Sequence, residues 1–368
     1  MLPFFNKIFM AINPNQGTGL HTASDQWREH LPTLWMLGKT GAGKSSLIQA
    51  LTGNSEIEVG NGFQPCTQTS ASYDFPPDKP LIRFLDTRGL AEADYDPAED
   101  IAACQKSSHA LMVIAKADDP EQSAITSALK HIQRISPIQH ILLVHTGIMS
   151  IGSERDQAIA HNQAQMEKAW GKTLPSVALD LIPDAGDPVG LESLREALHK
   201  LLPLVAELIQ TQSHKSCEEA NFARLKQDVL WHAGIAAGSD LAPAVGLVSV
   251  PAIQGKMLYN LAKQYDVSWD RQLFAEFAGV LGGGFAVKYA SNLGIRQLVK
   301  LIPAFGQTIG SASAAAISFT TTYALGRVAA KYLYHKSRGE SVSQAELKAL
   351  YGEAMKVVSE VTGRDKAI

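Results

Sequence analysis

Along residues 31–205, short apolar runs alternate with longer stretches in which apolar residues return every three or four positions. Runs of the first kind predict buried strands, and stretches of the second kind predict amphipathic helices. The predicted strands are at 34–37, 81–85, 110–115, 140–144 and 180–183. Because strands and helices alternate, the pattern predicts an α/β domain with a mainly parallel sheet flanked by helices.

Two of the intervening helices have recognisable ends or faces. Asp119 followed by Pro120 predicts the N-cap and first residue of one helix. After Pro188, leucines recur at helical spacing, at 191, 194, 198, 201 and 202. Such a stripe predicts a helix face packed on the core.

The pattern changes after this domain. Residues 206–230 are polar and predict a helical connector, whereas charges are sparse and Gly, Ala and Ser dominate from 231 to 333. We therefore expect residues 231–368 to form an all-α domain rich in small residues. Residues 301–326 form a stretch without charged residues that is long enough for a helix to span a bilayer. Within it, Gly306 and Gly310 have the spacing found where two helices pack closely. The Ser and Thr residues of this stretch fit a buried helix pair of a soluble domain equally well.

The first 30 residues predict a separate segment. Residues 1–12 are aromatic and apolar but lack the basic region and cleavage site of a signal peptide. They are expected to dock on the protein or on a membrane surface. Residues 13–26 are polar and contain glycine, which predicts a linker.

The sharpest motif lies between the first strand and the helix after it: Gly38-Lys39-Thr40-Gly41-Ala42-Gly43-Lys44-Ser45. It fits G-x-x-x-x-G-K-[ST], the phosphate-binding P-loop. The glycines allow several backbone N–H groups to point at one anion, and the helix start adds its positive dipole end. The predicted nucleotide-binding residues are Lys39, Thr40, Gly41, Ala42, Gly43, Lys44, Ser45 and Ser46, with Lys44 on the β- and γ-phosphates and the Ser45 hydroxyl on Mg²⁺.

A second motif follows the next apolar strand, as Asp86-Thr87-Arg88-Gly89. At a strand end downstream of a P-loop, the D-x-x-G pattern predicts that Asp86 holds Mg²⁺ through water. The N–H of Gly89 would contact a γ-phosphate and lose that contact on hydrolysis. Lys44, Asp86 and Gly89 are thus the candidate catalytic residues.

With these two motifs the sequence resembles the Era-like branch of the translation-factor-type GTPases, although Arg88 stands where that group usually has proline. The resemblance implies GTP and GDP as ligands with Mg²⁺. It also implies a switch threonine that ligates Mg²⁺ and counts among the catalytic candidates. Thr67 is the candidate for this role and Thr69 the competitor. Asp184 and Ala185 fall where the fifth motif would meet the base. Residues 230–360 resemble, in texture only, a bacterial domain of unknown function that is often predicted to be membrane-associated.

The fourth motif of that family, [NT]-K-x-D, is where this chain departs from it. Thr146 aligns with the Asn or Thr, but Gly147 replaces the lysine and Met149 the aspartate that accepts both guanine donors. Thr146 and Gly147 are the residues of this motif that we still expect to bind the nucleotide at its base. The departure predicts a weaker guanine preference. Lys116-Ala117-Asp118 comes one strand too early to be this motif.

Composition narrows the remaining choices. The net charge of −3 and a pI near 6.4 do not indicate nucleic-acid binding, for which a basic domain would be expected. Three scattered cysteines fit a reducing cytoplasm, including the inner face of the cytoplasmic membrane. The leading hypothesis is a GTPase switch whose 231–368 region meets a membrane or a protein partner, with a homodimer left open. The alternative is a pseudo-GTPase scaffold, and a P-loop kinase is disfavoured because D-x-x-G follows the strand.

Overall fold

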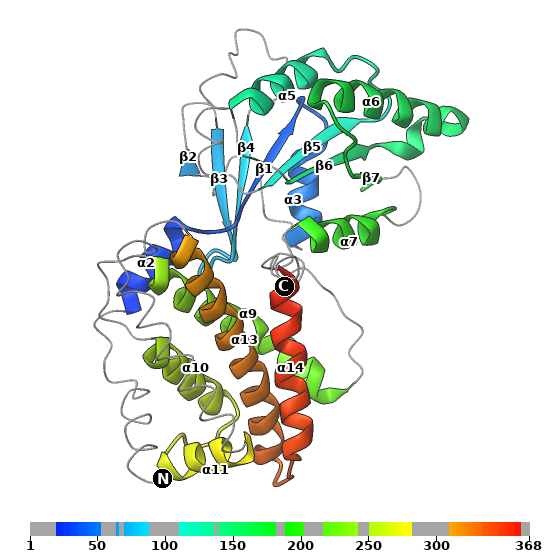
Figure 1. Cartoon of the computed structure of the whole chain (residues 1–368). Helices are drawn as coiled ribbons and strands as arrows, with labels where there is room; N and C mark the ends of the chain where they lie inside the picture. The colour runs from blue at the N-terminus through cyan, green and yellow to red at the C-terminus, as the bar shows by residue number, and fades with distance from the viewer. Residues whose placement is uncertain are drawn as a thin grey trace. The chain divides into compact units, whose positions relative to one another are not determined.

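The computed structural model describes residues 20–52, 64–65, 70–87, 110–135, 138, 140–181, 188–201, 216–241, 250–281 and 309–361. The chain divides into two compact units (Figure 1). One is Leu31–Thr211, and the other combines Met1–His30 with Gln212–Ile368. The first unit is built on a sheet, and the described part of the second is helical.

The sheet of the first unit has seven strands among the described residues, in the order β2-β3-β4-β1-β5-β6-β7. The strands from β4 to β7 are parallel to one another, whereas β3 pairs antiparallel with β4 and β2 antiparallel with β3. Their bounds are β1 Thr33–Gly38, β2 Gln64–Pro65, β3 Ser70–Phe75, β4 Ile82–Thr87, β5 Ala110–Lys116, β6 His140–Thr146 and β7 Ser176–Ala178. The predicted α/β class with a mainly parallel sheet is confirmed.

Helices cover both faces of this sheet, which explains why its central strands are apolar throughout. One face packs on α3 (Lys44–Thr52) and α7 (Leu191–Leu201), and the other on α5 (Ser123–Ile135) and α6 (Arg155–Trp170) (Figure 1). Leu194 and Leu198 are fully buried in the first of these cores, so the predicted leucine stripe is a core face. Successive residues of β1 alternate between the two cores, as Leu34 and Trp35 do.

Two predicted boundaries in this unit are wrong. The last strand is Ser176–Ala178, because these residues pair with β6, and Asp180 lies beyond it in an isolated bridge to Val189. Helix α5 begins at Ser123 and not at Pro120. The Asp119 carboxylate instead accepts the N–H of Glu121 at 3.0 Å, which closes a turn before the helix.

The second unit contains α2 (Leu20–Glu29), α9 (Cys217–Leu241), α10 (Val250–Gln264), α11 (Arg271–Leu281), α13 (Ile309–Ser337) and α14 (Gln344–Val361). Helix α2 replaces the last part of the predicted linker, because Trp27 packs closely on α9. A Cβ at Gly234 would lie 2.4 Å from the Trp27 ring, so this contact requires glycine. The predicted boundary at 230 falls inside α9, since the change in composition marks a more deeply buried part of one helix.

Polar side chains pair inside the helical unit. The Gln254 amide donates to the Thr322 hydroxyl at 2.9 Å, both residues being buried. Arg327 forms an ion pair with the nearly buried Glu218 and stacks 4.4 Å from the centre of the Phe222 ring. The described part of the chain contains no helix with both the length and the apolarity needed to cross a membrane. Residues 301–308 of the uncharged stretch lie outside that part.

Candidate functional site

The loop between β1 and α3 has the backbone that the P-loop pattern requires. Gly41 and Gly43 have φ values of 78° and 93°, in the left-handed region where a side chain is strained. The N–H of Ala42 donates to the Lys39 carbonyl at 3.2 Å, which closes a tight turn. Helix α3 starts at Lys44, so the N–H groups of its first turn face the loop. The arrangement can cradle an anion.

Lys44 places a positive charge inside this loop. Its side chain is buried, and its amine donates to the carbonyls of Gly38 at 3.0 Å and Lys39 at 3.2 Å. Ser45 and Ser46 follow on the first turn of α3 and are half-buried, and Thr40 is exposed on the loop. The cation, the hydroxyls and the helix start are thus gathered within one turn.

Asp86 lies at the end of β4, the strand next to β1, opposite Met36 in the register. One carboxylate oxygen, Oδ1, is buried without a hydrogen-bond partner among the described residues. Burial raises the pKa of Asp86 to about 6, against the opposing effect of the Lys44 charge. A buried carboxylate oxygen that no described residue satisfies suits a hydrated divalent cation, so these residues fit Mg²⁺.

Several predicted site residues cannot be placed. Thr67 and its competitor Thr69, together with Gly89, Asp184 and Ala185, lie outside the described residues. Their predicted roles on the γ-phosphate, the metal and the base stay predictions.

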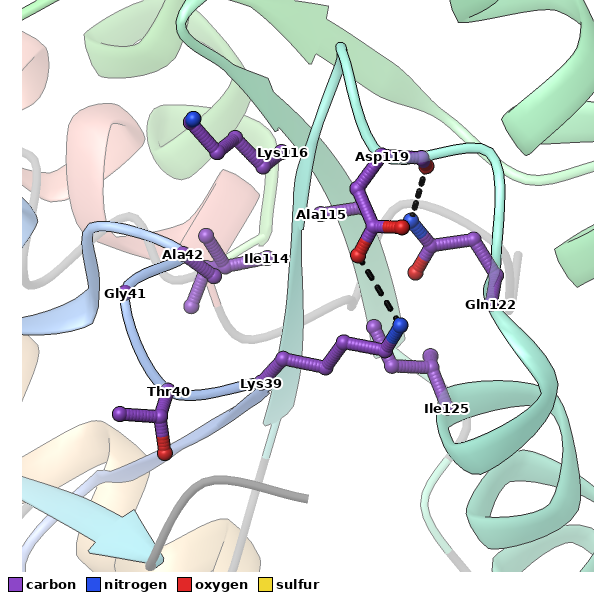
Figure 2. A pocket seen from close by; sticks show the side chains of 10 residues that line it. All are labelled: Lys39, Thr40, Gly41, Ala42, Ile114, Ala115, Lys116, Asp119, Gln122 and Ile125. Atoms are coloured by element: carbon purple, nitrogen blue, oxygen red, sulfur yellow. Dashed lines mark hydrogen bonds and ion pairs between the residues drawn. The ribbon is translucent and has the colours of Figure 1, made fainter. Parts of the chain in front are cut away.

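Lys39, by contrast, turns away from the phosphate loop. Its amine lies 2.9 Å from a carboxylate oxygen of Asp119, and both residues line a hollow of about 50 Å³ (Figure 2). The same amine lies 2.7 Å from a carboxylate oxygen of Glu121. Burial opposes the Lys39 charge, but hydrogen bonds to the two carboxylates outweigh it and raise the lysine's pKa. The hydrogen bond from Lys39 also lowers the pKa of Glu121 to about 2. Lys39 therefore ties the P-loop to the segment between β5 and α5.

The predicted base-binding residue Thr146 also contacts the P-loop. Its buried hydroxyl donates to the Ala42 carbonyl at 2.8 Å, and its methyl group packs against Gly43. Gly147 follows with a φ of 66° and begins a short 3-10 helix, Ile148–Ser150. The end of β6 is thus fixed directly to the loop after β1.

Two charged residues that the sequence did not assign lie beside this turn. The N–H of Met149 donates to the Asp180 carboxylate at 3.1 Å, although the Met149 side chain is 51% exposed. Lys116 pairs with Thr146 in the register of β5 and β6, and its side chain lies 3.7 Å from where a Gly147 Cβ would be. Figure 2 shows Lys116 pointing away from the Lys39 pair. The sequence did not predict a role for either residue at this turn, because Lys116 and Asp180 belong to different strands and form no contiguous motif.

Comparisons with known proteins agree with the loop geometry. Residues 33–146 match a family described as 50S ribosome-binding GTPase. Magnetosome membrane protein 22 of Magnetospirillum gryphiswaldense is 28% identical over 136 residues, which are 37% of this chain and 69% of that protein.

Solved structures show a more distant likeness. SsGBP in complex with GDP has a TM-score of 0.35 and 16% identity, over 49% of this chain and 52% of that one. A dimerization-deficient mutant of Toc33 from Arabidopsis thaliana has a TM-score of 0.35 and 17% identity, over 52% and 92%. The G domain of the T. maritima FeoB iron transporter has a TM-score of 0.31 and 22% identity, over 47% and 99%. This chain spans about half the length of SsGBP.

The match of residues 33–146 covers β1, the loop after it, Asp86 and the end of β6. It therefore includes both the phosphate-binding loop and the strand that carries Thr146. Residues 33–146 therefore match a GTPase family and have the P-loop GTPase fold.

Proposed function

We propose that this chain is a Mg²⁺-dependent switch that binds and hydrolyses GTP and couples the nucleotide state to its helical unit. The observation that carries the proposal is that Lys44, at the start of α3 after β1, and Asp86, at the end of the neighbouring strand β4, act electrostatically on one another. Lys44 supplies a buried cation at the start of α3, and Asp86 supplies a buried carboxylate oxygen that no described group satisfies.

The residues divide the work between the phosphates and the metal. The N–H groups of the loop and the Lys44 amine would bind the β- and γ-phosphates, and the metal would neutralise charge as it develops. The Ser45 hydroxyl and Asp86 would hold the metal, the latter through water. Thr67 and Gly89 would sense the γ-phosphate, as the resemblance implies.

The helical unit would carry the output of the switch to a membrane surface or a protein partner. The relative from Magnetospirillum gryphiswaldense is a magnetosome membrane protein by name, which supports vesicles as the first probe. A hollow of about 220 Å³ at the turn between α10 and α11 is lined by the aromatic residues Tyr259 and Trp269 together with Lys263, Asp266, Val267 and Ser268. Aromatic rings favour the interface of a bilayer, so this turn is the contact surface that we would test first.

A pseudo-GTPase scaffold is the second candidate. It is favoured by Gly147 and the exposed Met149, which stand where the family has its lysine and aspartate. It would hold nucleotide without useful turnover, so a rate measurement separates it from the switch.

The test is single-turnover hydrolysis of GTP and of ATP by the full chain, with and without Mg²⁺ and anionic vesicles. The switch predicts Mg²⁺-dependent hydrolysis and a nucleotide-dependent fraction of protein that sediments with vesicles. Lys44→Ala should abolish both, whereas Lys130→Ala, an exposed lysine on α5, should change neither. Tight binding without turnover would favour the scaffold, and a protein that ignores vesicles at low salt would remove the membrane half of the proposal.

A further inference from the structure

The parallel strands of the nucleotide unit end at one edge, where α/β folds bind their ligands. Along this edge lie, strand by strand, Asp86 on β4, the P-loop after β1, Lys116 on β5, Thr146 on β6 and Asp180 just after β7. Four strand spacings separate β4 from β7, or roughly 19 Å at about 4.8 Å each. Because Asp86 and Lys44 occupy the phosphate end, the base of a bound nucleotide extends toward β6 and β7.

A guanine base needs an acceptor for two donors, its ring N–H and its exocyclic amine. The family supplies this acceptor from the loop after β6, but this chain has Met149 there. The Met149 side chain is half exposed and has no acceptor for these donors. Its N–H, however, is held by the carboxylate of Asp180, so that carboxylate occupies the neighbourhood of the missing aspartate.

Asp180 is suited to the task by burial and position. It is 6% exposed, so it is among the few carboxylates buried in the described part of the chain. The bridge to Val189 fixes its backbone directly after β7. A carboxylate has about four acceptor sites, so it can accept hydrogen bonds from several donors at once. Burial makes a charge-assisted hydrogen bond there stronger and more selective.

A lysine is displaced in the same way. The family's lysine position is Gly147 in this chain, and the side chain of Lys116 from the adjacent strand lies beside Gly147. The atoms near Gly147 are carbons of the Lys116 side chain, and the Lys116 amine pairs with Asp118 at 2.8 Å. The carboxylate of Asp180 and the lysine side chain thus approach the turn from the strands on either side of β6.

We propose that Asp180 is the residue that determines guanine specificity, accepting the ring N–H and the exocyclic amine from β7 in place of the absent aspartate after β6. The proposal rests on the proposed function, because it assumes that the P-loop unit binds a nucleoside triphosphate. It changes the expectation from the sequence, since a chain with this carboxylate should discriminate between purines.

The test compares GTP, xanthosine triphosphate and ATP in competition for the full chain and for Asp180→Asn. Xanthine has a carbonyl where guanine has its amine, so an asparagine amide can donate to it. Asn also keeps an oxygen that accepts the Met149 N–H, so the turn is preserved. The parent should bind GTP more tightly than xanthosine triphosphate. Asp180→Asn should lower the affinity for GTP by roughly 10- to 100-fold and raise the affinity for xanthosine triphosphate. Asp156→Asn is the matched control, because that carboxylate is 89% exposed on α6.

Two results would decide against the proposal. The first is an unchanged ratio of the GTP and xanthosine triphosphate affinities in Asp180→Asn; where both affinities fall equally, Asp180 only supports the fold. The second is a parent protein that binds GTP without preferring it to xanthosine triphosphate. Tight binding of xanthosine triphosphate by the variant would show that the variant is folded. If the parent binds no nucleoside triphosphate at all, the proposed function is refuted, and this inference with it.

Discussion

The phosphate end and the base end of this site differ in how their residues are assembled. At the phosphate end, residues 38–45 form one contiguous segment, and among the described residues Asp86 joins it from the neighbouring strand. At the base end, Lys116, Thr146 and Asp180 come from three strands, β5, β6 and the end of β7. The difference follows from the ligands. A phosphate is bound largely by successive backbone N–H groups, whereas a base edge needs separate side chains at set positions.

The comparison is tested most strongly at Lys44, which should matter more than any residue of the base end. Lys44→Ala removes the buried cation from the loop, and charge-assisted contacts to phosphate are the strong ones. We expect nucleotide affinity to fall by about 100-fold or more, measured with a fluorescent GTP analogue in Mg²⁺. A Lys44→Ala protein that binds as tightly as the parent would refute the P-loop assignment, and Lys130→Ala serves as the control.

Substitution of Asp86 should change the stability of the fold and the Mg²⁺-dependent activity in opposite directions. Its pKa is raised by burial from an ordinary 3.8 to about 6, so the folded state holds its proton more tightly than the unfolded state. The resulting penalty is absent below about pH 4, grows as the pH rises to 6, and reaches at most about 3 kcal/mol above that. Asp86→Asn should therefore raise the free energy of unfolding at pH 8 without Mg²⁺ and flatten its dependence between pH 4 and 6.

The same substitution should weaken Mg²⁺-dependent hydrolysis and leave part of the nucleotide binding. In the parent, the affinity for Mg²⁺ should fall as the pH drops through about 6, because a protonated carboxyl no longer attracts the cation. Asp74→Asn is the control for a carboxylate on the same sheet that is paired, with Arg83 at 2.6 Å. Full Mg²⁺-dependent turnover in Asp86→Asn would remove Asp86 from the metal site.

The same contrast explains what the sequence could predict. The P-loop could be predicted because all the fixed positions of its motif lie within residues 38–45. The buried strands could be predicted because each is a run of apolar residues. The sequence misplaced the last strand, however, because Leu181 and Ile182 extend the apolar run past the residues that pair with β6. This error hid Asp180, whose importance depends on lying after β7 and beside Met149. The partners of Lys39 were equally hidden, since Asp119 and Glu121 lie about 80 positions away.

Thr146 joins the two ends and should have an intermediate effect. Its hydroxyl donates to the Ala42 carbonyl at 2.8 Å, so Thr146→Val leaves a carbonyl of the loop unsatisfied at nearly constant volume. A cost of about 1 kcal/mol corresponds to roughly a fivefold faster release of GTP. Thr126→Val, which removes a similar hydroxyl-to-carbonyl bond of 3.0 Å on α5, should leave the release rate unchanged. An unaltered rate in Thr146→Val would show that the two ends act independently.

The smallest effect should come from Lys39, which supports the loop from outside the cradle. Its amine holds Asp119 and Glu121, whose side chains are 32% and 60% exposed, so water and salt screen the pairs. Lys39→Met should speed GTP release by about two- to fivefold at low salt, and the difference should shrink in 0.5 M salt, where the Debye length is about 4 Å. Glu121→Gln and Asp119→Asn should each reproduce part of the effect. The opposite outcome would be a loss of nucleotide affinity in Lys39→Met as large as that in Lys44→Ala, at every salt concentration. Lys39 would then bind phosphate directly, and its ion pairs with the β5–α5 segment would have to break when nucleotide binds.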